Sequence, residues 1–439
     1  MRHLAGIAAI LFMVLPWAAA ESPLGKDAPV PAGRLIQQLG DANPVVREKA
    51  TQALEALGAA AIPALRRATD HADPEVRRRA AALLAAIEKA DLLQPRRVSL
   101  KVEGRPIREA VAELAKQTGY SIEVYPAAAN NDEREKQLHT LKLDNLPFWE
   151  ALDRVGREGG LVLQRTWGEE ARLQLRFADE YVPFVHHSGA FRLVAQGFQY
   201  NRSIEFATQP RGAPVPSQRS EQLTFRFLVM AEPRMPMLWM GKPVVTEAVD
   251  ELNNSLIPTE SADADRQAYH DRGFVHDAWI NLNRVARDAQ TVKRLRGIVP
   301  VRLLVEQTPD LVLDKVLQAK NRQLKSESTE LDIEEVKEVA VNGQKRCDVK
   351  FGVRNLRGAG GLDYNFYASV RYRLELQDAK GFRYNWGGGG WGGNENSVRG
   401  TFSFNHPGGE VGPPARIVFY GWNTLHHRVP FEFRDLPLP

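Results

Sequence analysis

The sequence predicts a multidomain protein: a short α-helical repeat, then a small α+β domain, then two β-sandwich domains of the immunoglobulin-like type. Three observations lead to this fold class. A segment recurs after 30 residues within residues 33–93, with apolar residues at helical spacing. A strand-helix-strand pattern occurs twice within residues 97–166. From residue 170 onward, short alternating runs bounded by Gly, Asn and Pro predict strands and turns.

The N-terminus has the three parts of a secretory signal peptide. Arg2 and His3 precede the apolar run 4–17, and the alanines at 18–20 supply a cleavage site. The run is shorter than the ~20 residues that a membrane-spanning helix needs. We therefore expect residues 1–20 to be removed, leaving a periplasmic or cell-envelope protein without a transmembrane span. The alternative is that the segment is kept as an anchor. Residues 21–32 are polar and proline-rich and predict a linker.

The cysteine count and the net charge limit the disulfides and the partners that this protein can have. Cys347 is the single cysteine among 439 residues, so no intrachain disulfide can form, and its alternating surroundings predict a small buried side chain. The formal net charge of +4 allows weak attraction to anionic polymers, but export argues against nucleic acid as a partner.

The helical segment contains two related units. "DANPVVREKATQAL" begins at Asp41 and "HADPEVRRRAAALL" begins at His71. Asn43 and Asp73 are suited to cap a helix, and the proline after each fits the first helical turn, where its missing N–H costs nothing. The pattern resembles HEAT repeats, a resemblance that implies a helical-hairpin scaffold for protein contacts. Two units are few for a solenoid, so we expect this segment to pack against a neighbouring domain or a partner.

The duplicated strand-helix-strand pattern accounts for residues 97–166. "LKVEGRPIREAVAEL" (100–114) is repeated 41 residues later by "LKLDNLPFWEALDRV" (141–155), and Gly119 and Gly160 end the two helices. One unit cannot cover its strands, whereas two complete a small core. The equivalent apolar stripes are Ile107, Val111, Leu114 and Phe148, Leu152, Val155. The pattern is similar to the secretin and TonB short N-terminal domain. This resemblance implies a periplasmic protein-docking module without catalytic activity.

Residues 170–320 and 325–439 are expected to form two related β-sandwiches. "LTFRFLV" (223–229) is similar to "CDVKFGV" (347–353), and "IVPVRLLVE" (298–306) is similar to "RVPFEFRDL" (428–436). These pairs predict equivalent strands in two copies of one fold. The polar segments 250–256 and 376–382 predict hairpin turns.

No catalytic, nucleotide-binding or metal-binding motif is present in the sequence, so we expect neither an enzyme nor a cofactor or metal site. The histidine- and aspartate-rich insert 259–279 is interpreted as a solvated loop, with a cation site or an acid/base pair as the alternative.

One stretch is a candidate binding site. "FRYNWGGGGWGG" (382–393) surrounds Trp386 and Trp391 with six glycines, and Tyr384 lies close in sequence. Exposed indoles stack on sugars or on partner side chains, so these three residues are the candidate ligand contacts. The alternative is a hairpin tip whose tryptophans fold back on the sandwich. We expect Trp386 to be packed and Trp391 to be exposed.

The function expected from these patterns is that of an exported, non-enzymatic adaptor or scaffold that binds proteins of the bacterial cell envelope. The alternative is a carbohydrate-binding envelope protein that uses the 382–393 stretch to bind polysaccharide. A hydrolase with a site spread among sandwich loops is a third class, and it would require carboxylates or histidines that converge in one pocket.

Overall fold

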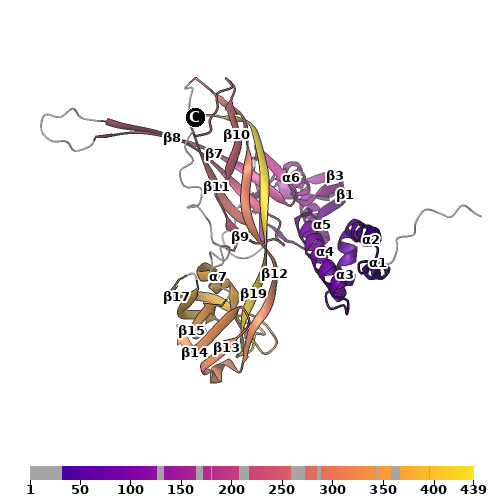
Figure 1. The fold of residues 1–439 in the computed structure, drawn as a ribbon. Helices are drawn as coiled ribbons and strands as arrows, with labels where there is room; N and C mark the ends of the chain where they lie inside the picture. Colours follow the sequence, from indigo (N-terminus) through magenta and orange to yellow (C-terminus); the bar gives the residue numbers. More distant parts are fainter. Residues whose placement is uncertain are drawn as a thin grey trace, which may run out of the picture. The chain divides into compact units, whose positions relative to one another are not determined.

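The computed structural model describes residues 32–125, 133–164, 172–178, 180–206, 217–258, 272–283, 288–341, 344–356, 366–394 and 396–439 (Figure 1). The expected signal peptide 1–20 lies outside these residues, as does the expected linker 21–32 apart from its last residue. The chain divides into two compact units, one ending at Asp91 and the other running from Leu92 to Pro439. No helix in the described ranges is long and apolar enough to cross a membrane.

A small helical region at the N-terminus is followed by several β-sheets, which confirms the predicted order of helix and strand. The helices of the first unit are α1 (Ala32–Gln38), α2 (Pro44–Leu57), α3 (Ile62–Ala68) and α4 (Pro74–Leu93). Asn43 caps α2 by accepting a hydrogen bond from the Val45 N–H at 2.9 Å. Asp73 accepts the Glu75 N–H at 2.8 Å in the same way before α4. Both predicted caps are therefore confirmed.

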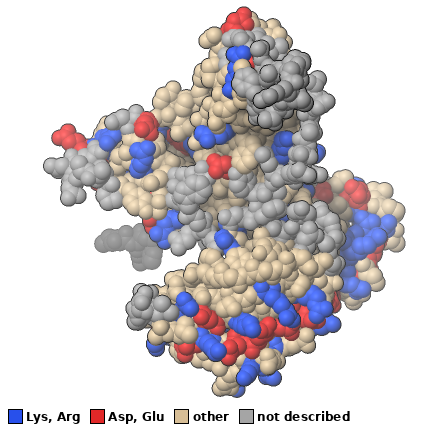
Figure 2. Space-filling model, turned by 90° about the vertical axis from the view of Figure 1, so that its left-hand side faces the viewer, with Lys and Arg blue, Asp and Glu red and all other residues tan. Residues whose placement is uncertain are grey.

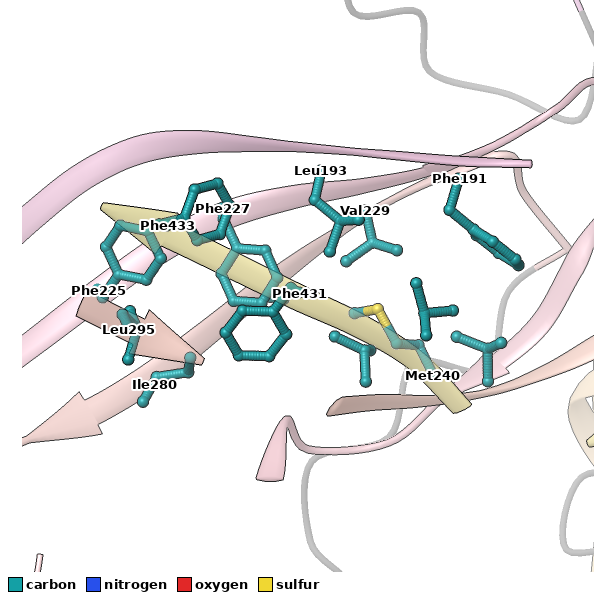
Figure 3. Close-up of a cluster of buried hydrophobic side chains, with 14 of the residues drawn as sticks. Phe191, Leu193, Phe225, Phe227, Val229, Met240, Ile280, Leu295, Phe431 and Phe433 are labelled. Atoms are coloured by element: carbon teal, nitrogen blue, oxygen red, sulfur yellow. The ribbon is translucent and has the colours of Figure 1, made fainter. Parts of the chain in front are cut away.

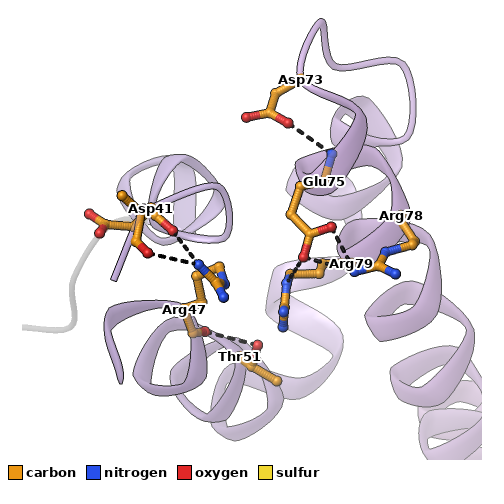
Figure 4. Close-up of polar contacts among 8 residues, drawn as sticks. Asp41, Arg47, Thr51, Asp73, Glu75, Arg78 and Arg79 are labelled. Atoms are coloured by element: carbon orange, nitrogen blue, oxygen red, sulfur yellow. Dashed lines mark hydrogen bonds and ion pairs between the residues drawn. The ribbon is translucent and has the colours of Figure 1, made fainter. Parts of the chain in front are cut away.

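A pair of equivalent arginines repeats one further contact in the two helical units, and Figure 4 shows the first of them, Arg47 beside Asp41. Arg47 Nη1 donates hydrogen bonds to the carbonyl oxygens of Asp41 and Ala42, at 2.7 and 3.1 Å. Arg77 Nη1 donates to the carbonyls of His71 and Ala72, at 2.6 and 2.9 Å. Each guanidinium thus satisfies carbonyls that the preceding turn leaves open, and it fixes the turn in the same way in both units.

The second unit begins with the duplicated pattern. Its elements are β1 (Arg97–Pro106), α5 (Ile107–Thr118), β2 (Ser121–Val124), β3 (Leu138–Pro147), α6 (Phe148–Gly159) and β4 (Leu161–Gln164). Gly119 and Gly160 end the two helices in the left-handed conformation, with φ of 73° and 59°. The two predicted apolar stripes are buried in one core, so the sequence identified this core correctly: Ile107, Val111, Leu114, Phe148, Leu152 and Val155.

The strands of this domain do not form one sheet. β1 pairs with β3 in an antiparallel ribbon, whereas β2 and β4 flank a further strand, β5 (Arg172–Phe177). β5 runs parallel to β2 and antiparallel to β4, and it buries Leu173 and Leu175 in the domain core. The sequence had assigned β5 to the first β-sandwich (170–320). It belongs here because β2 and β4, with four residues each, have no ladder partner without it.

Two antiparallel sheets follow and share a core. The strands of the first, in spatial order, are β11 (Val275–Leu282), β8 (Ser217–Ala231), β7 (Phe191–Phe206) and β6 (Val185–Ser188). Those of the second are β10 (Val244–Asp250), β12 (Thr291–Asp314), β19 (Pro414–Pro437) and β16 (Leu374–Asp378), with β9 (Met237–Met240) also paired to β12. β7 and β8 continue as a two-stranded ribbon beyond Leu223, where β11 ends.

Aromatic side chains fill the space between these sheets (Figure 3). Phe225 of β8 meets Phe433 of β19 edge to face at 5.4 Å between ring centroids, and Phe227 lies 5.3 Å from Phe431. All four rings are almost completely removed from water. Burying such rings supplies much of the hydrophobic stabilisation of a core.

The two long strands β12 and β19 correct the predicted domain plan. They have 24 residues each and pair from Thr291 opposite Pro437 to Asp314 opposite Arg416. The segments 298–306 and 428–436, interpreted as equivalent strands of two sandwiches, are direct neighbours in one sheet. They resemble each other because neighbouring strands bury the same face. The expected boundary between 170–320 and 325–439 therefore assigns β12 and β19 to different domains, although the two strands are paired and β19 residues up to Leu436 lie in the core between the facing sheets.

The C-terminal sheet has the order β13 (Lys320–Lys325), β14 (Thr329–Val341), β15 (Gln344–Asn355), β18 (Ser397–Asn405) and β17 (Asn385–Gly393). Helix α7 (Phe366–Arg373) contributes to its core. Cys347 is buried there as predicted, and burial raises the pKa of its thiol to about 12. The outward face carries ion pairs such as Lys350–Glu334 and Lys337–Glu335, both at 2.8 Å. Figure 2 shows the two charges interleaved across this lower body.

The duplicated core predicts a large cost for one leucine. Leu114 is 0% exposed, so Leu114→Ala should lower the free energy of unfolding by about 2–5 kcal/mol. Leu138, 64% exposed at the start of β3, is a matched control, and Leu138→Ala should stay within about 0.5 kcal/mol. Urea denaturation of both variants makes the comparison. Equal losses would contradict the assignment of the α5 stripe to the core.

Candidate functional site

The glycine- and tryptophan-rich stretch forms the edge strand β17 instead of a hairpin tip. Its residues pair with β18 on one side, with an irregularity at Gly387. Trp386 lies opposite Phe404 and Trp391 lies opposite Gly400. Because Phe404 belongs to the core, both indoles are on the core-facing side of the sheet, at its rim.

Gly400 decides how Trp391 packs. A Cβ atom at position 400 would lie 2.5 Å from the Cβ of Trp391, so only glycine lets the strands carry the indole at this point. The ring of Trp391 contacts Phe402 edge to face at 5.4 Å and packs against the core. Tyr367 of α7 donates its hydroxyl hydrogen to the Trp391 carbonyl oxygen at 3.3 Å. Trp391 is therefore held in place from two sides.

Trp386 is the more exposed of the two tryptophans, at 40%. Its ring stands edge to face against Trp391 at 6.5 Å. The guanidinium of Arg371 lies 5.3 Å from the Trp386 centroid, within the range of a cation–π contact. The expectation of a packed Trp386 and an exposed Trp391 is thus wrong, because the small partner residue Gly400 lies opposite Trp391.

Tyr384 does not join this group. Only 8% of its surface is exposed, and its hydroxyl donates to the Gly412 carbonyl oxygen at 2.7 Å. Burial raises the pKa of the phenol to about 12. Its side chain stabilises the fold, so of the three candidate contacts the structure brings together Trp386 and Trp391.

Sequence reasoning missed two members of the site, Tyr367 and Arg371. Both come from α7, the segment "FYASVRYR" that the sequence had placed among sandwich strands. Its aromatic and basic content was the available signal. The resulting surface offers an indole face for apolar or sugar groups and a guanidinium for a carboxylate.

Two polar clusters elsewhere in the second unit have structural roles. Asp153 of α6 contacts His187 Nε2 at 2.8 Å and Arg192 Nη2 at 2.8 Å. Burial tends to raise the pKa of Asp153, but the hydrogen bond with His187 and the charge of Arg192 outweigh it and lower this pKa. Arg192 is itself buried and needs a counter-charge. The cluster ties α6 to the β6–β7 hairpin.

The second cluster is centred on Glu232, which is 0% exposed. Tyr120 donates its hydroxyl hydrogen to Glu232 Oε2 at 2.6 Å, and the Arg96 N–H donates to Oε1 at 3.0 Å. Arg234 Nε lies 3.3 Å from the same carboxylate. Burial raises the pKa of Glu232 despite these contacts. The group joins the start of β1 to the turn after β8.

The histidine- and aspartate-rich insert 259–279 is described only in part. Its residues 259–271 lie outside the described ranges, and the remainder leads into β11. Across the part of the chain that the structure describes, no three His, Cys, Asp or Glu side chains are grouped so that they could hold a metal ion.

Comparison with known proteins identifies one segment. The family model for HEAT repeats matches residues 33–116, about a fifth of the chain. The match confirms the predicted helical repeat, and it runs past α4 into residues that fold as β1 and α5. No curated protein and no solved structure matches the chain.

The two tryptophans predict different stabilities for their alanine variants. Trp391→Ala should cost about 2–3 kcal/mol, because it removes an indole packed on Phe402. Trp386→Ala should cost about 1 kcal/mol or less, because 40% of this residue is exposed and it lies at the rim of the sheet. Melting midpoints of the two single variants provide the measurement. A larger drop for Trp386→Ala would contradict the observed packing.

Glu232 predicts a specific pH dependence. Because its pKa in the folded protein is raised above 4.5, its protonated form contributes stability that is fully present below pH 4.5. That contribution is lost as the pH rises through the folded pKa. Glu232→Gln, which is neutral at every pH, should remove this loss, so the variant should gain on the wild type as the pH rises. Urea midpoints measured across this range test it.

The control for this experiment is Glu103→Gln, since Glu103 is exposed on β1. It should leave the pH profile of the wild type unchanged. Parallel profiles for wild type and Glu232→Gln would show that the buried carboxyl does not titrate as inferred.

Proposed function

We propose that this chain is an exported, non-enzymatic adaptor that binds protein partners in the bacterial cell envelope. The observation that carries the proposal is the HEAT-repeat segment, which the family model matches and which forms a compact unit of its own. Helical repeats of this kind present extended surfaces to other proteins. The few units here bury a modest core, so binding a partner would add the apolar contacts that further repeats supply in longer solenoids.

The α+β domain supplies a second docking element in this proposal. Its duplicated strand-helix-strand order and its left-handed glycine caps are compatible with a domain like the secretin and TonB short N-terminal domain. The proposal also takes the two β bodies as immunoglobulin-like spacers, supported by their antiparallel sheets and face-to-face packing. Export rests on the pattern of residues 1–20.

A second candidate function is favoured by one observation. Trp386 is exposed beside Arg371, an arrangement suited to stacking on a sugar ring and to binding an acidic group on it. The chain would then bind envelope polysaccharide.

Affinity capture from a cross-linked envelope extract separates the two functions. The mature chain should capture a reproducible set of proteins, and a chain that begins at Leu92 should lose those that bind the HEAT-repeat unit. The truncation keeps Leu92 and Leu93, because both pack against the core between the two facing sheets. Trp386→Ala should retain the part of the set that depends on the HEAT-repeat unit.

Two outcomes would contradict the adaptor function. One is capture of the same set by the chain that begins at Leu92. The other is retention of the wild type on envelope polysaccharide with loss in Trp386→Ala, which would favour the carbohydrate-binding alternative.

A further inference from the structure

β17 is the last strand of the C-terminal sheet on one side. It pairs with β18, and no strand among the described residues pairs with its other edge. Such an edge leaves a row of backbone N–H and C=O groups that another extended chain can meet. Figure 1 places β17 at the side of this body, next to α7.

The two edges of this sheet differ in protection. The opposite edge, β13, carries Lys320, Arg322 and Lys325, and charges of this kind discourage strand pairing. β17 has nine residues, six of them glycine, with neither a charge nor a proline. The contrast within one sheet indicates that pairing is discouraged at β13 and permitted at β17.

The backbone of β17 is open on the face away from the core. Cβ atoms built at Gly388, Gly390 and Gly392 would meet nothing within 4 Å. The carbonyl of Trp391 already accepts a hydrogen bond from outside the ladder, from the hydroxyl of Tyr367. Side chains of an arriving strand would therefore find open space on this face, whereas the Trp391 carbonyl is already engaged by Tyr367.

The charges around β17 indicate the chemistry of its partner. The described elements beside it, β18 and α7, contain neither aspartate nor glutamate, and their arginines that are not buried are Arg371 and Arg399. Arg371 lies over the exposed indole of Trp386, and Arg399 lies opposite Gly392. An extended segment with carboxylates would have complementary charge at the Trp386 end of the strand, where Arg371 lies.

From these observations, we propose that the outer edge of β17 receives an extended, acidic segment of a partner protein as a sixth strand of this sheet. The inference rests on the proposed adaptor function and adds a docking place separate from the HEAT-repeat unit. Backbone hydrogen bonds supply affinity in this mode, and side-chain contacts with Trp386 and Arg371 supply selectivity.

The probe for the test is a short fluorescein-labelled peptide in which Thr and Glu alternate, titrated against the mature full-length chain by fluorescence anisotropy. Two matched peptides accompany it, one N-methylated at alternate residues and one with Lys in place of Glu. Both should bind roughly tenfold more weakly or worse, the first because it lacks ladder donors and the second because of its charge. Equal binding of the methylated peptide, or no binding of the parent peptide, would overturn the proposal.

Protein variants at the open glycines give the complementary test. The double variant Gly390→Glu, Gly392→Glu should weaken binding of the Thr/Glu peptide by roughly tenfold, whereas Gly390→Lys, Gly392→Lys should retain it. Both pairs place side chains where the structure leaves space, so their melting midpoints should match the wild type. Peptide binding should also slow amide exchange within residues 385–393. Unchanged exchange there, or equal binding by the Glu and Lys pairs, would overturn the assignment to this edge.

Two further outcomes separate this inference from its alternatives. A dimer in sedimentation that the Glu pair dissociates would make a second copy of the chain the occupant and would overturn the partner-segment proposal. The chain that begins at Leu92 should bind the peptide as the full chain does. In that chain, loss of envelope partners with retained peptide binding would support both proposals. Capture of HEAT-dependent partners by the full-length chain, together with no peptide binding, would overturn this inference alone.

Discussion

The pairing of β12 with β19 is the constraint on which the β-rich unit depends. Each strand is long enough to enter two cores, and their register is continuous apart from two irregularities. Val299 and Phe431 lie in the core between the facing sheets, whereas Leu311 and Phe419 lie in the core of the C-terminal body. A chain that leaves the first body through β12 must return through β19, so neither body can complete its core without residues of the other.

This arrangement determines where functional surfaces can lie. Where β10 or β9 pairs with β12, and where β16 pairs with β19, the long strands are internal in their sheet and their backbone groups are satisfied. In the five-stranded C-terminal sheet, the two outermost strands among the described residues are β13 and β17. Lysine and arginine protect the first, and glycine opens the second. The tryptophans at β17 have their positions because β18 offers Gly400 at one point and Phe404 at the other.

Polar groups hold the α+β domain to the β6–β8 strands that follow it. Glu232 is fully buried and is shared by Tyr120 and the backbone of Arg96, so the start of β1 is bound to the turn after β8. Asp153 performs the same task for α6 through His187 and Arg192. Removing the partners of either carboxylate would leave a buried charge without compensation. The free-energy cost of such a charge exceeds the stabilisation that the contact itself contributes. These contacts therefore specify one arrangement of the domain.

The sequence by itself determined the features that depend on a few neighbouring residues. Spacing alone predicts these features, because each lies within a single turn or helix. They are the caps at Asn43 and Asp73, the glycines that end helices at 119 and 160, and the two apolar stripes. Only the tertiary structure decided which strands are neighbours. The alternation of apolar and polar residues shows which face of a strand is buried, but it does not show which strand pairs with it. The pairing that places Ile298 opposite Pro430 could therefore not be predicted from the pattern. For the same reason the sequence did not predict which tryptophan is exposed. Gly400, which makes room for Trp391, lies on another strand. Arg371, which lies over Trp386, belongs to a helix that the sequence pattern did not predict.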